Sequence, residues 1–338
     1  MQRCIKLAEK GLGKTFPNPL VGSVIVYKDK IIGEGWHQKA GSFHAEVNAI
    51  SNVRNKEFLS KSTLYVSLEP CNHFGKTPPC SDIIIKNQIP RVVIASSDPN
   101  PLVAGKGIEK LKKAGCKVLI GVLKKEADFL NRRFFTFHNL KRPYIILKWA
   151  QTKNNFIAPI QKKTDNSEIF WITNNHSRQR VHKWRSEEAA ILVGVQTVIN
   201  DNPELTTREW TGNSPLRIVI DPNRRTPKNS KLFQDNIPTL FFTKDPIQLL
   251  PNKKEQKIVS PFSIKNILKE CYKLKIQSII IEGGLRTLEY FIKDNLWDEA
   301  RVFKTEKKIK TGIIAPEFKK ISNQTEIYEG DVLDIYFN

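Results

Sequence analysis

Residues 63–80 read TLYVSLEPCNHFGKTPPC, and the stretch SFHAEVNAI lies a short distance upstream at residues 42–50. The downstream stretch begins as an apolar run that is typical of a strand and continues into a polar loop that holds two cysteines. The upstream stretch places His44 and Glu46 at the start of a helical pattern. Strands that alternate with helices indicate an α/β sheet, so these residues set the fold class of the N-terminal part.

His44, Glu46, Cys71 and Cys80 carry the chemistry of these two stretches. Imidazole and thiolate groups are ligands that zinc prefers, and catalytic zinc sites take three protein ligands and keep a fourth position for water. A glutamate that stays off the metal can move the protons of that water. His-x-Glu followed by Pro-Cys and a second Cys is the signature of zinc-dependent nucleobase deaminases. The pattern predicts that His44, Cys71 and Cys80 bind Zn²⁺ and that Glu46 is catalytic.

The spacing of the cysteines leaves a second interpretation open. Eight residues separate Cys71 from Cys80, whereas the usual spacing in these deaminases is Cys-x-x-Cys. A closed structural zinc site would need a fourth protein ligand, and His73 could supply it. That interpretation leaves Glu46 without a role, so the open catalytic site is favoured.

The composition indicates a two-domain globular protein. The chain has 338 residues, 40% of them hydrophobic, and we place the domains at residues 1–142 and 143–338. Charges interrupt each apolar run before the roughly 20 residues of a membrane span, and the N-terminus lacks the apolar core of a secretory signal. Five cysteines, of which Cys4, Cys116 and Cys271 lie in apolar or helical runs, fit a reducing cytoplasm rather than a disulfide framework.

The formal net charge of +21 is spread over both halves of the chain. Such a charge can attract nucleic acid or phosphorylated small molecules. Lysine and asparagine are abundant even in loop-like stretches such as PNKKEQK at residues 251–257, so we attribute most of the excess to a solvated surface. The charge alone therefore does not indicate a nucleic-acid-binding protein.

Both halves show alternating strand and helix patterns, which predict an α/β class for the whole chain. In the first half we expect helices at 2–12, after His44, after Cys80 and at 105–115, one connecting helix at 123–140, a hairpin at 21–37 with its turn at 28–30, and strands at 63–69, 91–98 and 116–122. In the second half we expect strands at 142–150, 189–194, 215–221, 239–243 and 277–283, a final strand at 299–305, helices at 177–186 and 285–294, and an exposed loop region at about 243–262.

The second half has a candidate phosphate-binding turn. Glu282, Gly283 and Gly284 end an apolar run and precede a helical pattern that begins near Arg286. A glycine pair before a helix lets backbone N–H groups approach a phosphate closely. The stretch is not a G-x-G-x-x-G sequence, so a standard Rossmann site is not indicated.

Further polar residues follow the apolar strand at 189–194. Thr197, Asp201 and Arg208 come after that strand, where α/β sheets bind ligands. Arg185, in the helical pattern before the strand, could grip a phosphate together with Arg208. Arg178 and Arg180 are interpreted as part of a solvated helix face.

Taken together, these motifs closely resemble the RibD family of bifunctional riboflavin-biosynthesis proteins. The deaminase part of that family is matched by TFPNPLVGSVIV (15–26), GEGWHQKAGSFHAE (33–46), LYVSLEPCNHFGKTPPCSD (64–82) and SSDPNPLVAGKGIEKLKKAG (96–115). Its reductase part is matched by PYIILKWAQT (143–152), FWIT (170–173), HKWRSEEAAILVGVQTVINDNPELTTR (182–208), PLRIVID (215–221) and IIIEGG (279–284). The resemblance implies a cytidine-deaminase-like three-layer α/β/α domain and a dihydrofolate-reductase-like α/β domain.

The resemblance also implies two consecutive reactions. Zinc-dependent deamination of 2,5-diamino-6-ribosylamino-4(3H)-pyrimidinone 5′-phosphate would be followed by NADPH reduction of the ribosyl side chain. Substrate positions implied by the match are Asn18, His37, Lys76 and Asp98 in the first domain and Arg185, Leu205, Arg208 and Glu282 in the second. The implied cofactor positions are Ala150, Trp171, Thr197, Asp201, Gly284, Leu285, Arg286 and Thr287. We add Lys148, which ends a strand, as a hypothetical electrostatic or proton-transfer residue.

One departure from the family pattern concerns the reductase. The family usually reads Ser-Leu-Asp-Gly after the Lys-x-Ala segment, whereas this chain reads Thr152-Lys153-Asn154-Asn155. Asn154 and Asn155 thus replace the Asp and the Gly of the family. Asparagine keeps hydrogen-bonding capacity and tolerates left-handed backbone, but the negative charge of the aspartate is lost. Alternatives therefore stay open: a deaminase with a degenerate reductase domain, or a nucleic-acid-editing zinc deaminase. The favoured interpretation implies a cytoplasmic homo-oligomer that acts on a small phosphorylated pyrimidine and binds neither nucleic acid nor membrane.

Overall fold

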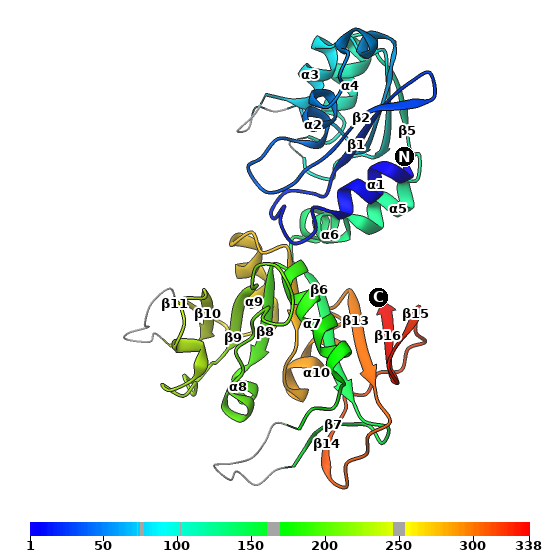
Figure 1. Ribbon diagram of the computed structural model, residues 1–338. Helices are drawn as coiled ribbons and strands as arrows, with labels where there is room; N and C mark the ends of the chain where they lie inside the picture. Colours follow the sequence, from blue (N-terminus) through cyan, green and yellow to red (C-terminus); the bar gives the residue numbers. More distant parts are fainter. Residues whose placement is uncertain (73, 75–77, 102, 161–169, 246–253) are drawn as a thin grey trace. The chain divides into compact units, whose positions relative to one another are not determined.

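The computed structural model describes residues 1–72, 74, 78–101, 103–160, 170–245 and 254–338. The chain forms two compact units, Met1–Lys141 and Arg142–Asn338, and each is described by itself (Figure 1). Both units are α/β, as the alternating patterns predicted. Among the described residues, no helix is long and apolar enough to cross a membrane.

The first unit is built on a five-stranded sheet with the order β2-β1-β3-β4-β5. The strands are β1 (Gly22–Tyr27), β2 (Lys30–Trp36), β3 (Thr63–Leu68), β4 (Arg91–Ser96) and β5 (Lys117–Ile120). β1 pairs antiparallel with β2 and β3, whereas β3, β4 and β5 run parallel. Lys28 and Asp29 both have positive φ, as the tight hairpin turn between β1 and β2 requires, and the predicted hairpin is confirmed.

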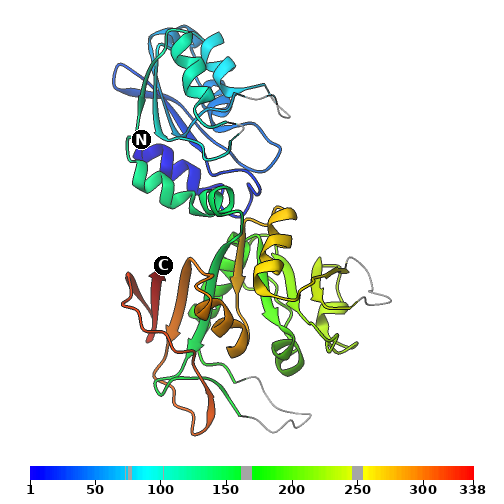
Figure 2. The same ribbon diagram turned by 180° about the vertical axis from the view of Figure 1, so that it is seen from behind.

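Helices cover both faces of this sheet (Figure 2). They are α1 (Gln2–Glu9), α2 (Ala45–Ser51), α3 (Cys80–Lys86), α4 (Lys106–Lys113), α5 (Lys124–Leu130) and α6 (Arg132–Leu140), with a 3-10 helix at Lys56–Lys61. Ala49 of α2, Ile84 of α3 and Leu111 of α4 share one apolar core with the sheet. α1 packs against β1 and β3 and contacts α5, which itself packs on β4, so a second helical layer lies opposite.

The single connecting helix expected at 123–140 was wrong, because two helices meet at Asn131. The Asn131 side chain is buried, accepts a hydrogen bond from the backbone N–H of Leu20 and donates one to the carbonyl of Leu20. An asparagine that satisfies both backbone groups of a distant residue fixes the break between α5 and α6. Such a contact across 111 residues has no local sequence signal.

The second unit contains a nine-stranded sheet with the order β11-β10-β9-β8-β12-β6-β13-β16-β15. Its strands are β6 (Tyr144–Gln151), β8 (Ala190–Gly194), β9 (Leu216–Ile220), β10 (Thr239–Thr243), β11 (Lys254–Ile258), β12 (Ser278–Ile281), β13 (Glu299–Lys304), β15 (Gln324–Tyr328) and β16 (Asp331–Phe337). The seven strands from β11 to β13 run parallel, and β16 and β15 add antiparallel at one edge. β7 (Phe156–Pro159) and β14 (Gly312–Ile314) form a separate two-stranded sheet.

Helices again cover both faces of the large sheet. They are α7 (Asn175–Glu187), α8 (Val195–Asp201), α9 (Ile264–Lys273) and α10 (Leu285–Lys293), with a 3-10 helix at Lys231–Phe233. Trp184 of α7 and Val198 of α8 belong to one buried cluster, while Cys271 of α9 and Phe291 of α10 belong to the other. The two apolar layers explain why the central strands are hydrophobic on both faces.

Two expectations for the second unit were wrong. The strand at 299–305 is not the last, because β16 pairs with it and β15 pairs with β16. The stretch around 243–262 is not wholly a loop, because β11 pairs in parallel with β10. β11 and β15 are the two edge strands of the sheet and are rich in charged or polar residues, so they lack the apolar run by which the central strands were found.

Candidate functional site

Close packing of α2 on β2 positions the first predicted metal ligand. A Cβ added at Gly35 would lie 2.6 Å from the Ala45 carbonyl oxygen, so only glycine allows the helix to approach the strand this closely. The Asn48 side-chain amide adds a hydrogen bond to the Trp36 carbonyl oxygen. His44 is the N-cap of α2, and Glu46 lies buried in its first turn, as the sequence predicted.

The three predicted zinc ligands come together at this helix start. His44 Nδ1 lies 3.2 Å from Cys80 Sγ and 3.5 Å from Cys71 Sγ, and the Cys80 backbone N–H points at Cys71 Sγ. Zinc–nitrogen and zinc–sulfur bonds of about 2.0 and 2.3 Å at a tetrahedral angle give a ligand separation of about 3.5 Å. The spacing therefore fits zinc. His73, the fourth ligand of a closed structural site, lies outside the described residues; among those described, these three residues form the group suited to a metal.

Burial and hydrogen bonding set the protonation of this cluster. Desolvation raises the pKa of Glu46 to about 7, because the carboxyl group is buried. Hydrogen bonds from Cys80, and then from His44, lower the pKa of the Cys71 thiol to about 4. A thiolate is the form that binds zinc, so this favours metal binding at neutral pH.

Asn18 and His37, two predicted substrate residues, form a hydrogen-bonded pair. Burial lowers the pKa of His37, so its imidazole is neutral near pH 7. His37 Nδ1 lies 3.1 Å from the Phe43 carbonyl oxygen and therefore carries the proton, which leaves Nε2 to accept from the Asn18 amide at 3.0 Å. The His37 and His44 rings meet edge to face, so the pair lies directly beside the zinc ligands.

Glu69 is a positioning residue that the sequence interpretation missed, although it stands in the SLEPC stretch. Its buried carboxylate accepts hydrogen bonds from the backbone N–H groups of Asp98, Gly105, Gly107 and Ile108. These bonds tie the end of β4 and the start of α4 to the loop that carries Cys71. Asp98, a predicted substrate residue, is buried there, and desolvation raises its pKa to about 6.

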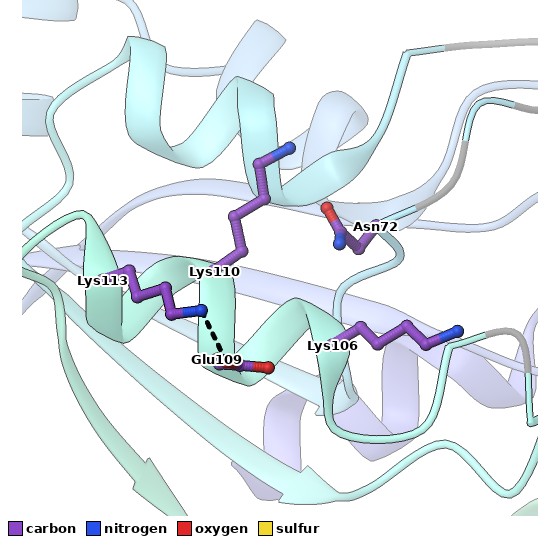
Figure 3. A pocket seen from close by; sticks show the side chains of 5 residues that line it. All are labelled: Asn72, Lys106, Glu109, Lys110 and Lys113. Atoms are coloured by element: carbon purple, nitrogen blue, oxygen red, sulfur yellow. Dashed lines mark ion pairs between the residues drawn. The ribbon is translucent and has the colours of Figure 1, made fainter.

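A basic recess lies next to the zinc loop. Asn72 lines a cavity of about 380 Å³ together with Lys106, Lys110, Lys113 and Glu109 of α4 (Figure 3). Glu109 pairs with Lys113 at 2.6 Å, and Lys110 pairs with Asp82 of α3. The recess keeps a net positive charge that attracts anions. Lys76, the remaining predicted substrate residue of this unit, lies outside the described residues.

In the second unit, the predicted residues gather at the carboxyl ends of neighbouring parallel strands. β8, β12 and β6 are adjacent in the sheet; Thr197 follows β8 and Glu282 follows β12, while Lys148 lies within β6 just past the point where Leu147 pairs with Ile281, the last residue of β12. This edge is where open α/β sheets bind ligands. The topology therefore brings together residues as distant in the sequence as Lys148 and Glu282.

Lys148, Arg185 and Glu282 form a half-buried charged triad. Arg185 donates two hydrogen bonds to the Glu282 carboxylate at 2.9 and 2.8 Å, and Lys148 Nζ lies 3.7 Å from the same carboxylate. Burial opposes ionisation of Glu282, yet Arg185 and Lys148 together lower its pKa to about 2. Burial lowers the pKa of Lys148, although Glu282 opposes that shift. The carboxylate is thus ionised and fixed at neutral pH.

The expected phosphate clamp of Arg185 and Arg208 stays a prediction, because Arg185 is largely engaged by protein groups. The remaining arm of the Arg185 guanidinium donates to the Thr206 carbonyl oxygen, so its fork is already engaged by protein groups. Arg208 is exposed nearby, whereas Leu205 is buried with positive φ and shapes the turn between them. Of the two arginines, only Arg208 presents an exposed side chain to a phosphate.

Most of the predicted cofactor positions surround the glycine pair. A Cβ added at Gly283 would lie 2.9 Å from Thr197 Oγ1, so the turn approaches α8 more closely than a side chain would allow. Gly284 has positive φ and caps α10, whose first turn holds Leu285, Arg286 and Thr287. Thr287 is buried and Arg286 is exposed, while Asp201 lies one turn beyond Thr197 on α8.

Ala150 and Trp171 complete the predicted cofactor positions. Ala150 lies near the end of β6, two residues beyond Lys148. Trp171 is exposed, and its ring faces the Arg178 guanidinium at 4.5 Å. Arg178 is therefore not simply solvated, because it packs against a predicted cofactor residue. Arg180 likewise lies 3.8 Å from Glu326 and is half-buried.

The departure at residues 152–155 has a structural explanation. Asn154 donates to the Ile309 carbonyl oxygen at 2.7 Å and accepts from the Ile309 N–H, which needs both halves of an amide. Asn155 has a φ of 61°, a conformation that glycine and asparagine adopt most readily. The turn between β6 and β7 is intact, so these substitutions do not themselves indicate a degenerate domain.

A His-Cys-Cys cluster beside a buried glutamate, together with a charged triad at the ligand-binding edge of a second sheet, is the arrangement expected of a zinc deaminase joined to a reductase. The family model for the cytidine and deoxycytidylate deaminase zinc-binding region matches residues 1–96, and that for the RibD C-terminal domain matches residues 143–305. The chain belongs to the RibD family and carries the deaminase and reductase domains of a bifunctional riboflavin-biosynthesis enzyme.

Relatives and solved structures match almost the whole chain. RibD of Aquifex aeolicus is 46% identical over 90% of this chain and 85% of its own length. RibD of Escherichia coli is 34% identical over 90% of this chain and 86% of its own length. The Thermotoga maritima deaminase/reductase structure superposes with a TM-score of 0.89 at 35% identity, covering 99% of this chain and 96% of that one. The structure of Acinetobacter baumannii RibD superposes with a TM-score of 0.88 at 32% identity, covering 99% of this chain and 97% of that one. These matches favour the two-domain enzyme over a nucleic-acid-editing deaminase.

Proposed function

We propose that the chain catalyses two consecutive steps of riboflavin biosynthesis. The first is hydrolytic deamination of 2,5-diamino-6-ribosylamino-4(3H)-pyrimidinone 5′-phosphate, and the second is NADPH reduction of its ribosyl side chain to ribityl. The observation that carries the first step is the convergence of His44, Cys71 and Cys80 beside the buried Glu46. The Thermotoga structure named as a deaminase/reductase of this pyrimidine supports the choice of substrate.

Glu46 is the proton carrier of the deaminase step in this proposal. Zinc, held by His44, Cys71 and Cys80, would supply Lewis acidity that makes a water nucleophilic near neutral pH. The Glu46 carboxylate takes a proton from that water and returns protons to the ring nitrogen and the departing amine. Burial of the carboxyl group raises its pKa, which favours its holding a proton between these two transfers.

The surroundings of Glu46 supply substrate contacts. The Asn18 amide nitrogen is held by His37, so the orientation of the Asn18 side chain, with its carbonyl oxygen, is fixed beside the zinc ligands. Asp98 is placed by the hydrogen bonds to Glu69 and lies at the end of the neighbouring strand. The net positive recess lined by Asn72 and Lys106 would attract a phosphorylated substrate.

The reductase step is assigned to the Lys148–Glu282 pair. NADPH supplies the hydride, which C1′ of the opened ribosylimine accepts. The Lys148 ammonium stabilises or protonates the imine nitrogen. Glu282, which is held by two hydrogen bonds from Arg185, keeps Lys148 in place and accepts hydrogen bonds from the sugar. Arg208 would bind the 5′-phosphate from its exposed position.

Removing zinc is expected to separate the two activities. Chelation should abolish ammonia release from the diaminopyrimidinone, because the metal that makes the water nucleophilic is removed. NADPH oxidation with the already deaminated intermediate should continue at its original rate, because no metal ligand is assigned in the second unit. The check is both assays before and after chelation and after zinc is restored; ammonia release that survives complete zinc removal would contradict the assignment.

Two further features remain part of the proposal. The enzyme is proposed to work in the cytoplasm, where its free cysteines stay reduced. A homo-oligomeric state is proposed from the resemblance of the sequence to the family.

A further inference from the structure

His182 is a buried histidine that no step of the proposed reaction uses. It lies on α7, three residues before Arg185, and only 3% of its surface is exposed. Residues three apart on a helix share a face, so the two side chains are directed toward the same neighbouring segment. His182 Nδ1 is buried and has no hydrogen-bond partner among the residues that the structure describes. Burying an unmet ring nitrogen costs free energy, so packing alone does not account for a histidine at this position.

The segment that faces this side of α7 is residues 205–209, which carries Arg208. Arg185 donates a hydrogen bond to a backbone carbonyl oxygen of the segment at 3.0 Å. His182 Nε2 lies 3.6 Å from the carboxylate oxygen Oε1 of Glu209. Arg208 stands between these two contacts in the sequence, and its side chain is exposed. The segment is therefore held against α7 on both sides of the arginine that is proposed to bind the 5′-phosphate.

The backbone around Arg208 is fixed as well. The N–H and the hydroxyl of Thr207 donate to Ser214 Oγ and to the preceding carbonyl oxygen, at 3.1 and 3.3 Å. Gly212 has a φ of 134°, and a Cβ added there would lie 2.7 Å from Ser186 Cβ of α7, so the loop closes tightly on the helix. These contacts set where Arg208 lies, and the side chains beside it decide which group its guanidinium can bind.

Glu209 is a competitor for the Arg208 guanidinium, because a carboxylate beside an arginine can pair with it. In the structure the Glu209 carboxylate lies by His182 instead. The histidine is neutral near pH 7, because burial lowers its pKa to about 4 and the guanidinium groups of Arg185 and Arg208 add to that shift. A neutral imidazole carries one N–H, and we assign it to Nε2, since the carboxylate that faces this nitrogen only accepts hydrogen bonds. At 3.6 Å the N–H dipole attracts the carboxylate without forming a full hydrogen bond.

We propose that His182 is a positioning residue of the reductase, which keeps Glu209 against α7 and so leaves Arg208 to bind the 5′-phosphate of the substrate. This inference rests on the proposed reductase function and deepens it, because it identifies what keeps the phosphate-binding arginine available. The chemical step is assigned to the Lys148–Glu282 pair, so His182 acts on substrate affinity and not on hydride transfer. Without the His182 N–H, the Glu209 carboxylate turns to Arg208, and that ion pair must break before the phosphate binds.

The test measures KM and kcat for NADPH oxidation by the full chain, with the deaminated intermediate supplied with or without its 5′-phosphate. His182→Leu should raise KM for the phosphorylated form about fivefold, the upper end of what an exposed ion pair contributes, and leave kcat unchanged. His182→Gln keeps an N–H near the position of Nε2 and should stay close to the wild-type KM. Adding Glu209→Gln to His182→Leu should also restore the wild-type KM, because the competing charge is gone. The KM for the form without phosphate should be the same in every variant.

The matched control is His176→Leu, which makes the same change at an exposed histidine of α7 and should keep the wild-type KM. If His182→Leu does not fold, His182→Asn carries the same expectation, because its shorter side chain withdraws the N–H from Glu209.

The outcomes separate this inference from the proposed function. An unchanged KM in His182→Leu, or a rise in KM that Glu209→Gln does not reverse, would overturn the role of His182 and leave the reductase function intact. An equal rise in KM for the intermediate without phosphate would also overturn it, because the effect would then not pass through Arg208. Wild-type protein that oxidises no NADPH with the deaminated intermediate would instead overturn the proposed reductase function, and this inference with it.

Discussion

Glu46→Gln is expected to lose ammonia release by about 10²- to 10⁴-fold, the usual contribution of a general acid–base residue. The glutamine has the same shape as Glu46 but cannot take a proton from water or return one to the amine. Glu46 is buried in the first turn of α2 and is not one of the three zinc ligands of the cluster. Zinc content should therefore stay at that of the wild type.

The measurement is ammonia release under saturating diaminopyrimidinone, combined with metal analysis of the same sample. Glu57→Gln makes the same chemical change at an exposed position and should leave the rate unchanged. NADPH oxidation with the deaminated intermediate should be normal in both variants. Full ammonia release by zinc-loaded Glu46→Gln would remove the basis for the deaminase assignment, whereas loss of zinc would mean that Glu46 supports the metal instead.

Lys148→Ala is expected to lower NADPH oxidation by about 10²- to 10⁴-fold with the deaminated intermediate. The substitution removes the lysine of the half-buried triad, while Arg185 still holds the Glu282 carboxylate through two hydrogen bonds. Because Glu282 keeps a charged partner, the variant should fold. Loss of activity would thus report on the chemistry rather than on an unpaired buried charge.

The matched control is Lys153→Ala, which removes an exposed lysine that pairs with Glu306. It should keep the wild-type rate of NADPH oxidation, and both variants should keep ammonia release. Full turnover by Lys148→Ala would show that Lys148 takes no part in the reaction.

The sequence predicted the zinc cluster because its spacing carries the chemistry directly. His44 and Glu46 are fixed by a helix start, and Cys71 and Cys80 lie at a strand end and a helix start, all of which have local sequence signals. The hairpin at Lys28 and Asp29 and the central strands were predictable for the same reason.

What the sequence did not predict depends on contacts between distant residues. The engagement of Arg185 by Glu282 spans 97 positions and leaves no pattern in the chain, so a free phosphate-binding arginine was expected instead. The role of Glu69 is of the same kind, since its four partners lie 29 to 39 residues away. The break at Asn131 and the edge strand β15 likewise follow from tertiary contacts rather than from local preference.

A coupled assay on zinc-loaded full-length protein tests the two-step assignment most directly. The diaminopyrimidinone ribosyl phosphate is supplied with NADPH, and ammonia release and NADPH oxidation are followed in the same cuvette. The account predicts both signals, with NADPH oxidation dependent on prior deamination. Ammonia release without NADPH oxidation, when added deaminated intermediate is not reduced either, would contradict the reductase assignment, and the absence of both signals would contradict the account as a whole.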